Sequence, residues 1–197
     1  MSTAILVLAA GSSSRMAPRD KLTEVVEQIP LLRRQTKAAC ATGHPVFVTL
    51  PNGNPARTAA LKDLDVTIVY VNNSSQGMSA SIATGAAAMP SEMSNLVVLP
   101  ADMPDITTDD LLAVINASQS SPDQICQGHT AAGQPGHPVA FPKRLFGQLR
   151  ALQGDRGAKS LLLAEDVKAV PLPFDHAITD LDTPEDWEAW RRNRNPL

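Results

Sequence analysis

Residues 4–16, AILVLAAGSSSRM, run from an apolar stretch directly into one glycine, three serines and an arginine. The apolar part is too short for a membrane span or a signal peptide, and no basic segment precedes it, so it predicts a first β-strand. A glycine at the carboxyl end of a strand permits close backbone approach, and the serines add N–H and hydroxyl donors. The stretch therefore predicts a phosphate-binding loop. A tight surface turn with a solvated arginine is the alternative.

Two familiar phosphate loops do not fit this stretch. The dinucleotide fingerprint GxGxxG fails because positions 13 and 16 are Ser and Met, and the chain contains no GK followed by Ser or Thr. What remains is Gly11 followed at short range by two cations, Arg15 and Lys21. The predicted phosphate-binding loop therefore belongs to neither of these two types.

Strand-like runs alternate with helical patterns along the chain. The compact runs that are apolar on both faces cover residues 4–10, 45–50, 66–71 and 95–99. The helical patterns among them cover residues 31–43, 79–89 and 107–118. The later part is less regular, with candidate strands at 137–142 and 167–173 and candidate helices at 143–152, 157–166 and 183–194. This order predicts an α/β fold with a mostly parallel sheet, which binds ligands at the carboxyl ends of its strands.

Composition limits the class of protein. The chain has 197 residues, 43% of them hydrophobic, which predicts one globular domain over residues 1–197. The net charge is −3 and the 17 basic residues are spread out, so we expect no nucleic-acid or membrane partner. Cys40 and Cys126 are isolated, which argues against a zinc site or a disulfide framework and favours the cytoplasm.

An aspartate follows the predicted strand 95–99 in the sequence LPADMPD. Asp102 would lie at the same sheet edge as Gly11, where a carboxylate can hold Mg²⁺ against a phosphate. The alternative is an aspartate that caps the next turn. Pro100 and Pro104 fix the backbone on either side and favour the metal role.

Two more aspartates stand in TDLDTPEDWEAW, residues 179–190. Asp180 and Asp182 alternate in a short extended segment, so we expect them to point to opposite faces and only one to reach a site easily. Asp182 also precedes Thr183 and Pro184, where a helix N-cap would stand. Metal binding and capping both remain open for Asp182.

Taken together, seven stretches resemble, in order, the molybdenum-cofactor nucleotidyltransferase family, and most closely its cytidylyltransferases. They are LAAGxSxRM, Lys21, GMSASIATG, LPADMP, GQPGHPVAFP, LQGDRGAK and DLDTPED. The resemblance implies a three-layer α/β/α fold of the nucleotide-diphosphosugar-transferase type, which is Rossmann-like. It also implies transfer of CMP from CTP to the terminal phosphate of molybdopterin with release of pyrophosphate, aided by Mg²⁺ or Mn²⁺, and an apo-molybdoenzyme as a transient client. The alternatives are a guanylyltransferase or another transferase of this fold, and a non-catalytic protein that delivers molybdopterin.

The resemblance also implies roles for individual residues. Arg15, Lys21 and Asp102 would be catalytic, and Asp102 and Asp182 would hold the metal. The expected nucleotide-binding residues are Leu8, Ala9, Ala10, Gly11, Ser12, Ser13, Ser14, Arg15, Lys21, Gly77, Ser79, Ser81 and Ala101. The expected acceptor-side residues are Gly136, His137, Asp155, Lys159 and Asp180. Three of these residues have ordinary alternatives, because Ser79 and Asp155 could cap helices and His137 could be an exposed loop histidine.

The sequence departs from the family pattern at the loop. Ser13 and Ala17 stand where glycines are more frequent, and residues 17–20 lengthen the step to Lys21. Ala10 stands where guanylyltransferases of the family carry glycine. Its methyl group would narrow the space that guanine needs, which favours cytosine.

Overall fold

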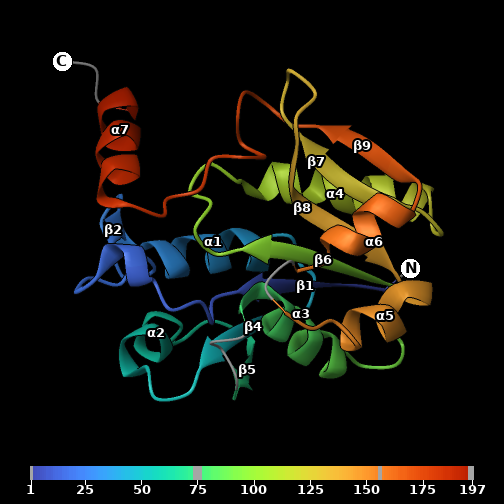
Figure 1. The fold of residues 1–197 in the computed structure, drawn as a ribbon, viewed down its shortest axis with the longest axis horizontal. Coiled ribbons are helices and arrows are strands. Elements are labelled where there is room, and N and C mark those ends of the chain that lie inside the picture. Colours follow the sequence, from blue (N-terminus) through green and yellow to red (C-terminus); the bar gives the residue numbers. More distant parts are fainter. Residues whose placement is uncertain (1, 73–76, 155–156, 195–197) are drawn as a thin grey trace.

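A seven-stranded sheet forms the centre of the computed structural model, which describes residues 2–72, 77–154 and 157–194 (Figure 1). Its strands are β1 (Thr3–Leu8), β4 (Val46–Pro51), β5 (Thr67–Val71), β6 (Asn95–Pro100), β7 (Ile125–His129), β8 (Pro135–Pro142) and β9 (Val167–Pro171). They are ordered β5-β4-β1-β6-β8-β7-β9. All neighbouring pairs are parallel except those of β8, which runs antiparallel to both β6 and β7. The predicted mostly parallel α/β sheet is confirmed.

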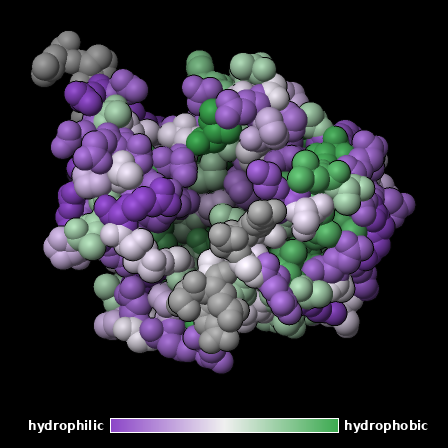
Figure 2. Space-filling view, in the orientation of Figure 1, coloured by the Kyte–Doolittle hydropathy of each residue, from purple (hydrophilic) through white to green (hydrophobic). Residues whose placement is uncertain are grey.

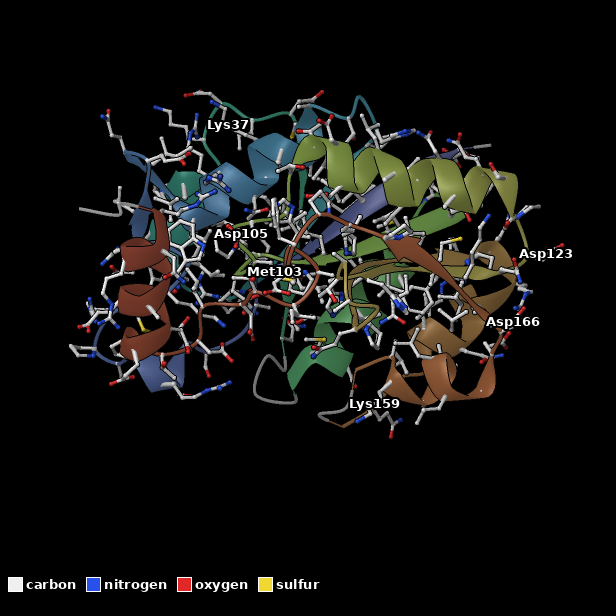
Figure 3. The ribbon with its side chains drawn as sticks, turned by 90° about the horizontal axis from the view of Figure 1, so that it is seen from above. Lys37, Met103, Asp105, Asp123, Lys159 and Asp166 are labelled. Atoms are coloured by element: carbon white, nitrogen blue, oxygen red, sulfur yellow. The ribbon has the colours of Figure 1, made fainter. Side chains whose placement is uncertain are left out.

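Helices cover both faces of the sheet. They are α1 (Leu31–Cys40), α2 (Pro55–Ala60), α3 (Gly77–Ala87), α4 (Thr108–Ser120), α5 (Phe146–Arg150), α6 (Lys159–Ala164) and α7 (Pro184–Arg194). Short 3₁₀ turns cover Ser14–Met16 (η1) and Lys143–Leu145 (η3), and β2 (Val25–Val26) pairs with β3 (Ile29–Pro30) as a separate small hairpin. In Figure 3, α1 and α4 lie on one side of the sheet and α3 and α6 on the other. The three-layer arrangement follows from this placement.

The hydrophobic core divides according to the alternation of the strands. In β1, Ile5 and Val7 join the cluster that packs against α1 and α4, whereas Ala4 and Leu6 join the cluster that packs against α3 and α5. Successive side chains of a strand point to opposite faces, so a strand covered by helices on both sides must be apolar throughout. This is why residues 4–8 carry no polar side chain.

The sequence patterns missed three elements. They are the strand β7, the helix α2 and the hairpin β2–β3. β7 reads ICQGH, whose polar half hides the strand pattern. Runs that are apolar on both faces predict strands buried between helix layers, and for residues 66–71 this prediction was wrong, because β5 lies at the edge of the sheet and Tyr70 is 48% exposed.

A third cluster joins the end of the chain to the loop after β1. Helix α7 lies beside β2 at one side of the molecule, and its surface is mainly hydrophilic (Figures 1 and 2). On its inner side Trp187 is buried with Met16 and Leu181, and Trp190 meets Trp187 edge-on at 6.3 Å between ring centroids. This packing gives Trp187 and Trp190 a structural role. It also holds together the loop after β1 and the segment before α7, and both of these segments line the functional site described next.

Within the described part of the chain, none of the helices combines the length and apolarity needed to cross a bilayer.

Candidate functional site

A cavity of about 530 Å³ opens at the carboxyl ends of β1 and β6. From β1 the chain proceeds to β4 and β5 on one side, whereas β6 lies on the other side, so the strand order reverses at β1. In open α/β sheets the crevice at such a reversal is the usual place for ligands. Because β8 is antiparallel to β6, its first residues, Gly136 and His137, reach the same edge and line the same cavity.

Most of the site residues expected from sequence line this cavity. They are Leu8, Ala10, Gly11, Ser12, Arg15, Lys21, Gly77, Ser81, Asp102, Gly136, His137, Asp180 and Asp182. The structure does not place the following expected residues on its wall: Ala9, Ser13, Ser14, Ser79, Ala101 and Lys159. Ala9, Ser79 and Ala101 are buried within the fold, and Lys159 is exposed at the outer surface, away from Met103 of the cavity (Figure 3). Asp155 lies outside the described residues.

Two cations and two carboxylates meet at the floor of the cavity. The Lys21 ammonium donates hydrogen bonds to Oδ2 of Asp102 and to Oδ1 of Asp182. The guanidinium of Arg15 lies 2.7 Å from the other oxygen of Asp182. Burial by itself lowers the pKa of Lys21, but the two carboxylates outweigh it and the net pKa is raised. Lys21 therefore stays protonated and positively charged in the site.

Asp180 lies at the same cavity as Asp182, so the expectation that only one of them would reach the site was wrong. The expectation rested on strand alternation, but residues 179–182 form an irregular segment without strand pairing. Burial and the neighbouring charges of Asp102 and Asp182 raise the pKa of Asp180. The carboxyl group of Asp180 therefore ionises less readily than that of an ordinary aspartate, because it is buried beside two other carboxylates.

The open question of whether Asp182 caps α7 is answered by the backbone around it. The Asp186 carboxylate accepts hydrogen bonds from the N–H groups of Asp182 and Thr183, and the Thr183 hydroxyl accepts one from the N–H of Asp186. Thr183 and Asp186 thus satisfy the start of the helix reciprocally. The Asp182 side chain is directed to Lys21 and Arg15 instead.

His137 is half-buried at the cavity rather than an exposed loop histidine. Burial lowers the pKa of its imidazole, while the charge of Asp102 and a bond to the backbone of Val98 oppose this shift. Its Nδ1 atom is buried without a hydrogen-bond partner. Because this nitrogen has no exposed surface, it is not available to a ligand in the cavity as the ring is placed here.

Arg57 of α2 supports the loop after β1, and sequence reasoning missed it. Its guanidinium is 2% exposed and pairs with Asp20 at 2.7 Å. It donates to the carbonyl oxygens of Ala9 at 2.6 Å and Gly11 at 2.7 Å, and to the Ser13 hydroxyl at 3.0 Å. Burial by itself raises the pKa of Asp20, but the hydrogen bond and charge of Arg57 outweigh it and the net pKa is lowered. No local pattern signals this role, because the partners lie more than thirty positions away along the chain.

The same network explains how the loop tolerates Ser13. Ser13 has a φ of 50°, in the left-handed region where glycine is least strained. For a residue other than glycine, the left-handed region costs about 1–2 kcal/mol. The Ser13 hydroxyl donates to Asp20 at 3.0 Å and accepts from Arg57, which offsets that cost. Ser13 therefore supports the loop from behind rather than facing the cavity.

We expect Arg57→Met to lower the free energy of unfolding by about 3–5 kcal/mol, because it leaves Asp20 and two backbone carbonyls without their buried partner. Urea denaturation measures this change. Arg192→Met is the matched control, since Arg192 is exposed on α7, and its unfolding free energy should stay within about 0.5 kcal/mol. Equal stability of the two variants would contradict the supporting role of Arg57.

The carboxylates of Asp102 and Asp182 fit a divalent cation. Both direct an oxygen to the same ammonium group, so a single cation between them can reach both. Oxygen ligands of this kind suit Mg²⁺ and Mn²⁺. Among the residues whose positions are described, no group of three or more His, Cys, Asp or Glu side chains is arranged around one metal position. Further ligands would therefore come from water or from phosphate oxygens.

The protein combines a reversal of strand order, a glycine-containing loop and two cations that contact carboxylates. An α/β protein with these features is suited to bind a nucleotide with a divalent cation. The chain belongs to the MobA-like NTP transferase domain family, whose model matches residues 5–169. Its fold is that of the nucleotidyltransferases, as predicted.

Individual relatives agree with this assignment. The chain is 27% identical to the molybdenum cofactor cytidylyltransferase of Escherichia coli strain K12 over 183 residues, 92% of each chain. It is 24% identical to Rv0371c of Mycobacterium tuberculosis H37Rv, with a TM-score of 0.84 and coverage of 96% and 97%. A second structure of Rv0371c, in complex with manganese, gives 23% identity, a TM-score of 0.81 and the same coverage. A CMP:2-keto-3-deoxy-manno-octonic acid synthetase in complex with CTP gives 11% identity and a TM-score of 0.78 over 98% of both chains.

Proposed function

We propose that this protein transfers CMP from CTP to the terminal phosphate of molybdopterin and releases pyrophosphate. The observation that carries the proposal is the convergence of Arg15, Lys21, Asp102 and Asp182 on one cavity at the strand reversal of a nucleotidyltransferase fold. The likeness to a molybdenum cofactor cytidylyltransferase over 92% of the chain supports the choice of substrates. We further propose that residues 1–197 act as one domain, since strands drawn from residues 3–171 share one sheet. We also propose a cytoplasmic location, which the two isolated cysteines favour.

The reaction needs no nucleophile from the protein. An oxygen of the molybdopterin phosphate forms a bond to the α-phosphorus of CTP, the bond from that phosphorus to the bridging oxygen breaks, and pyrophosphate leaves with the electron pair. Arg15 and Lys21 line the cavity and would neutralise the triphosphate as negative charge moves to the leaving group. Asp102 and Asp182 would hold Mg²⁺ or Mn²⁺, which neutralises phosphate charge when bound.

The residues that line the cavity come from segments with different chemistry. Ala10 from the loop after β1, with Gly77 and Ser81 from α3, would receive the nucleotide. Gly77 has a φ of 75°, a conformation that glycine adopts without strain. At the start of β8, Gly136 and His137 would receive the acceptor, and His137 would contact its phosphate or pterin group.

We expect a clear preference for CTP over GTP, because Ala10 lines the cavity and its methyl group would take up space that a purine needs. Discrimination by shape and by single contacts is about 10- to 200-fold in kcat/KM. Ala10→Gly should shift the preference partly toward GTP, and only partly because residues 77–81 also shape the wall. The measurement is pyrophosphate release with each of the four nucleotides, molybdenum-loaded molybdopterin and Mg²⁺.

The same panel separates the alternatives. Equal use of GTP by the natural protein would contradict the cytidylyltransferase proposal and favour a guanylyltransferase of this fold. Tight binding of molybdopterin without turnover of any nucleotide would favour a delivery protein. An apo-molybdoenzyme that takes up the product is a further part of the proposal.

A further inference from the structure

The positive charges of the site already occupy the carboxylates that would hold the metal. Lys21 contacts one oxygen of Asp102 and one of Asp182, and Arg15 contacts the second oxygen of Asp182 at 2.7 Å. Both oxygens of Asp182 are therefore engaged by side chains of the protein itself. A divalent cation that takes the position between the two carboxylates, where the ammonium now lies, must replace the contacts of Lys21.

Lys21 is the stronger of the two competitors. Its side chain is 13% exposed, whereas that of Arg15 is 67% exposed, so solvent screens Arg15 more. Lys21 also touches both carboxylates, and its compact ammonium on a flexible stem can move between nearby anions. Separating a partly buried lysine from two carboxylates is costly unless another anion receives it.

A nucleoside triphosphate supplies such an anion. The charged side chains that line the described cavity are Arg15 and Lys21 against Asp102, Asp180 and Asp182, which is two positive against three negative charges. A triphosphate without metal would enter a site with no surplus of positive charge, and a metal without triphosphate would have to displace the lysine. The metal therefore supplies the positive charge that the triphosphate needs, and the triphosphate supplies the anion that receives the lysine.

We propose that Lys21 is an internal counter-ion that blocks the metal position until a triphosphate draws its ammonium away from Asp102 and Asp182. Metal and nucleotide then bind with positive coupling, beyond their affinity for each other in solution. By linkage, each strengthens the binding of the other by the same factor. The inference rests on the proposed function only in taking a nucleoside triphosphate as the ligand.

The test measures Mn²⁺ binding by electron paramagnetic resonance, without any acceptor or turnover. Lys21→Met removes the charge and keeps the length of the side chain. In the absence of nucleotide we expect this variant to bind Mn²⁺ more tightly than the natural protein, by a factor in the range of about 5–150, typical of coupled sites. Adding CTP, with the Mn²⁺–CTP complex alone as reference, should strengthen binding in the natural protein and much less in the variant.

Three matched variants separate the local effect of the Lys21 charge from a general change in the charge of the protein. Lys37→Met makes the same change in charge on the outer side of α1 (Figure 3) and should leave Mn²⁺ binding unchanged. Lys21→Arg keeps the charge and should not tighten binding. Adding Asp102→Asn to Lys21→Met should abolish the gain, because the gain depends on the freed carboxylate.

A thermal melt gives a second readout if Lys21→Met is unstable. Removing the ammonium leaves neighbouring carboxylates uncompensated, so Mn²⁺ should raise the Tm of the variant more than that of the natural protein. Equal or weaker Mn²⁺ binding by folded Lys21→Met, or a gain that survives Asp102→Asn, would overturn the counter-ion proposal. Failure of the natural protein to turn over CTP would instead overturn the proposed function and leave the Mn²⁺ comparison valid.

Discussion

Asp102→Asn is expected to lower turnover by about 10²–10³-fold while the protein stays folded, the scale of losing one electrostatic contact to a transition state. The amide keeps the shape of the side chain but loses the charge that would bind the metal, and it leaves Lys21 with one carboxylate fewer. Pyrophosphate release at saturating CTP and Mg²⁺ measures the loss.

The matched control for this experiment is Asp123→Asn. Asp123 is exposed and lies at the far side of the molecule from Met103 of the cavity (Figure 3). The turnover of the Asp123→Asn variant should therefore equal that of the natural protein. A folded Asp102→Asn protein with near-normal pyrophosphate release would exclude Asp102 from the metal site.

The second large effect is expected at Asp182. Asp182→Asn should lower turnover by roughly 100-fold, because Lys21 and Arg15 both lose the carboxylate that they contact and a metal bound as proposed would lose a ligand. Asp180→Asn should cost less than about tenfold, the value of one weak polar contact. The same pyrophosphate assay compares the two single variants.

This pair of variants is informative because Asp180 and Asp182 share one cavity and are separated by a single residue in the chain. Asp182 contacts the cations, whereas Asp180 is a neighbour whose pKa is raised by burial and by Asp102 and Asp182. A larger loss at Asp180 than at Asp182 would show that the metal had been assigned to the wrong carboxylate and would require a different arrangement in the bound state.

The prediction of a phosphate-binding loop rests on residues that lie close together in the sequence. An apolar strand, Gly11 and two nearby cations lie within residues 4–21, and the structure brings Arg15 and Lys21 to the cavity. Residues 17–20 lengthen the step to Lys21, and the structure places its ammonium between Asp102 and Asp182. The cluster formed by Met16, Leu181 and Trp187 holds the loop and the segment before α7 together, and Lys21 contacts Asp182 across that junction.

The start of β8 shows the limit of reasoning from local pattern. The sequence marked GQPGHPVAFP as a motif, but not that β8 would run antiparallel to β6 and thereby return His137 to the carboxyl ends of the parallel strands. Strand direction depends on which neighbour a strand pairs with, and that neighbour lies about forty positions earlier in the chain. The same limit explains the incorrect expectation of opposite faces for Asp180 and Asp182, since only pairing would have imposed alternation.

By itself the sequence determined the α/β class, because strands buried between two helical layers must be continuously apolar and their turns must carry glycine or polar residues. It also determined which residue types stand at the ends of β1 and β6. Only the tertiary structure decided that Arg57 would hold the loop through Ala9, Gly11 and Asp20, and that Lys21 would join Asp102 to Asp182. The physical reason is distance along the chain: helical and strand periodicity act over a few residues, whereas these ion pairs form between segments that meet only after the sheet has assembled.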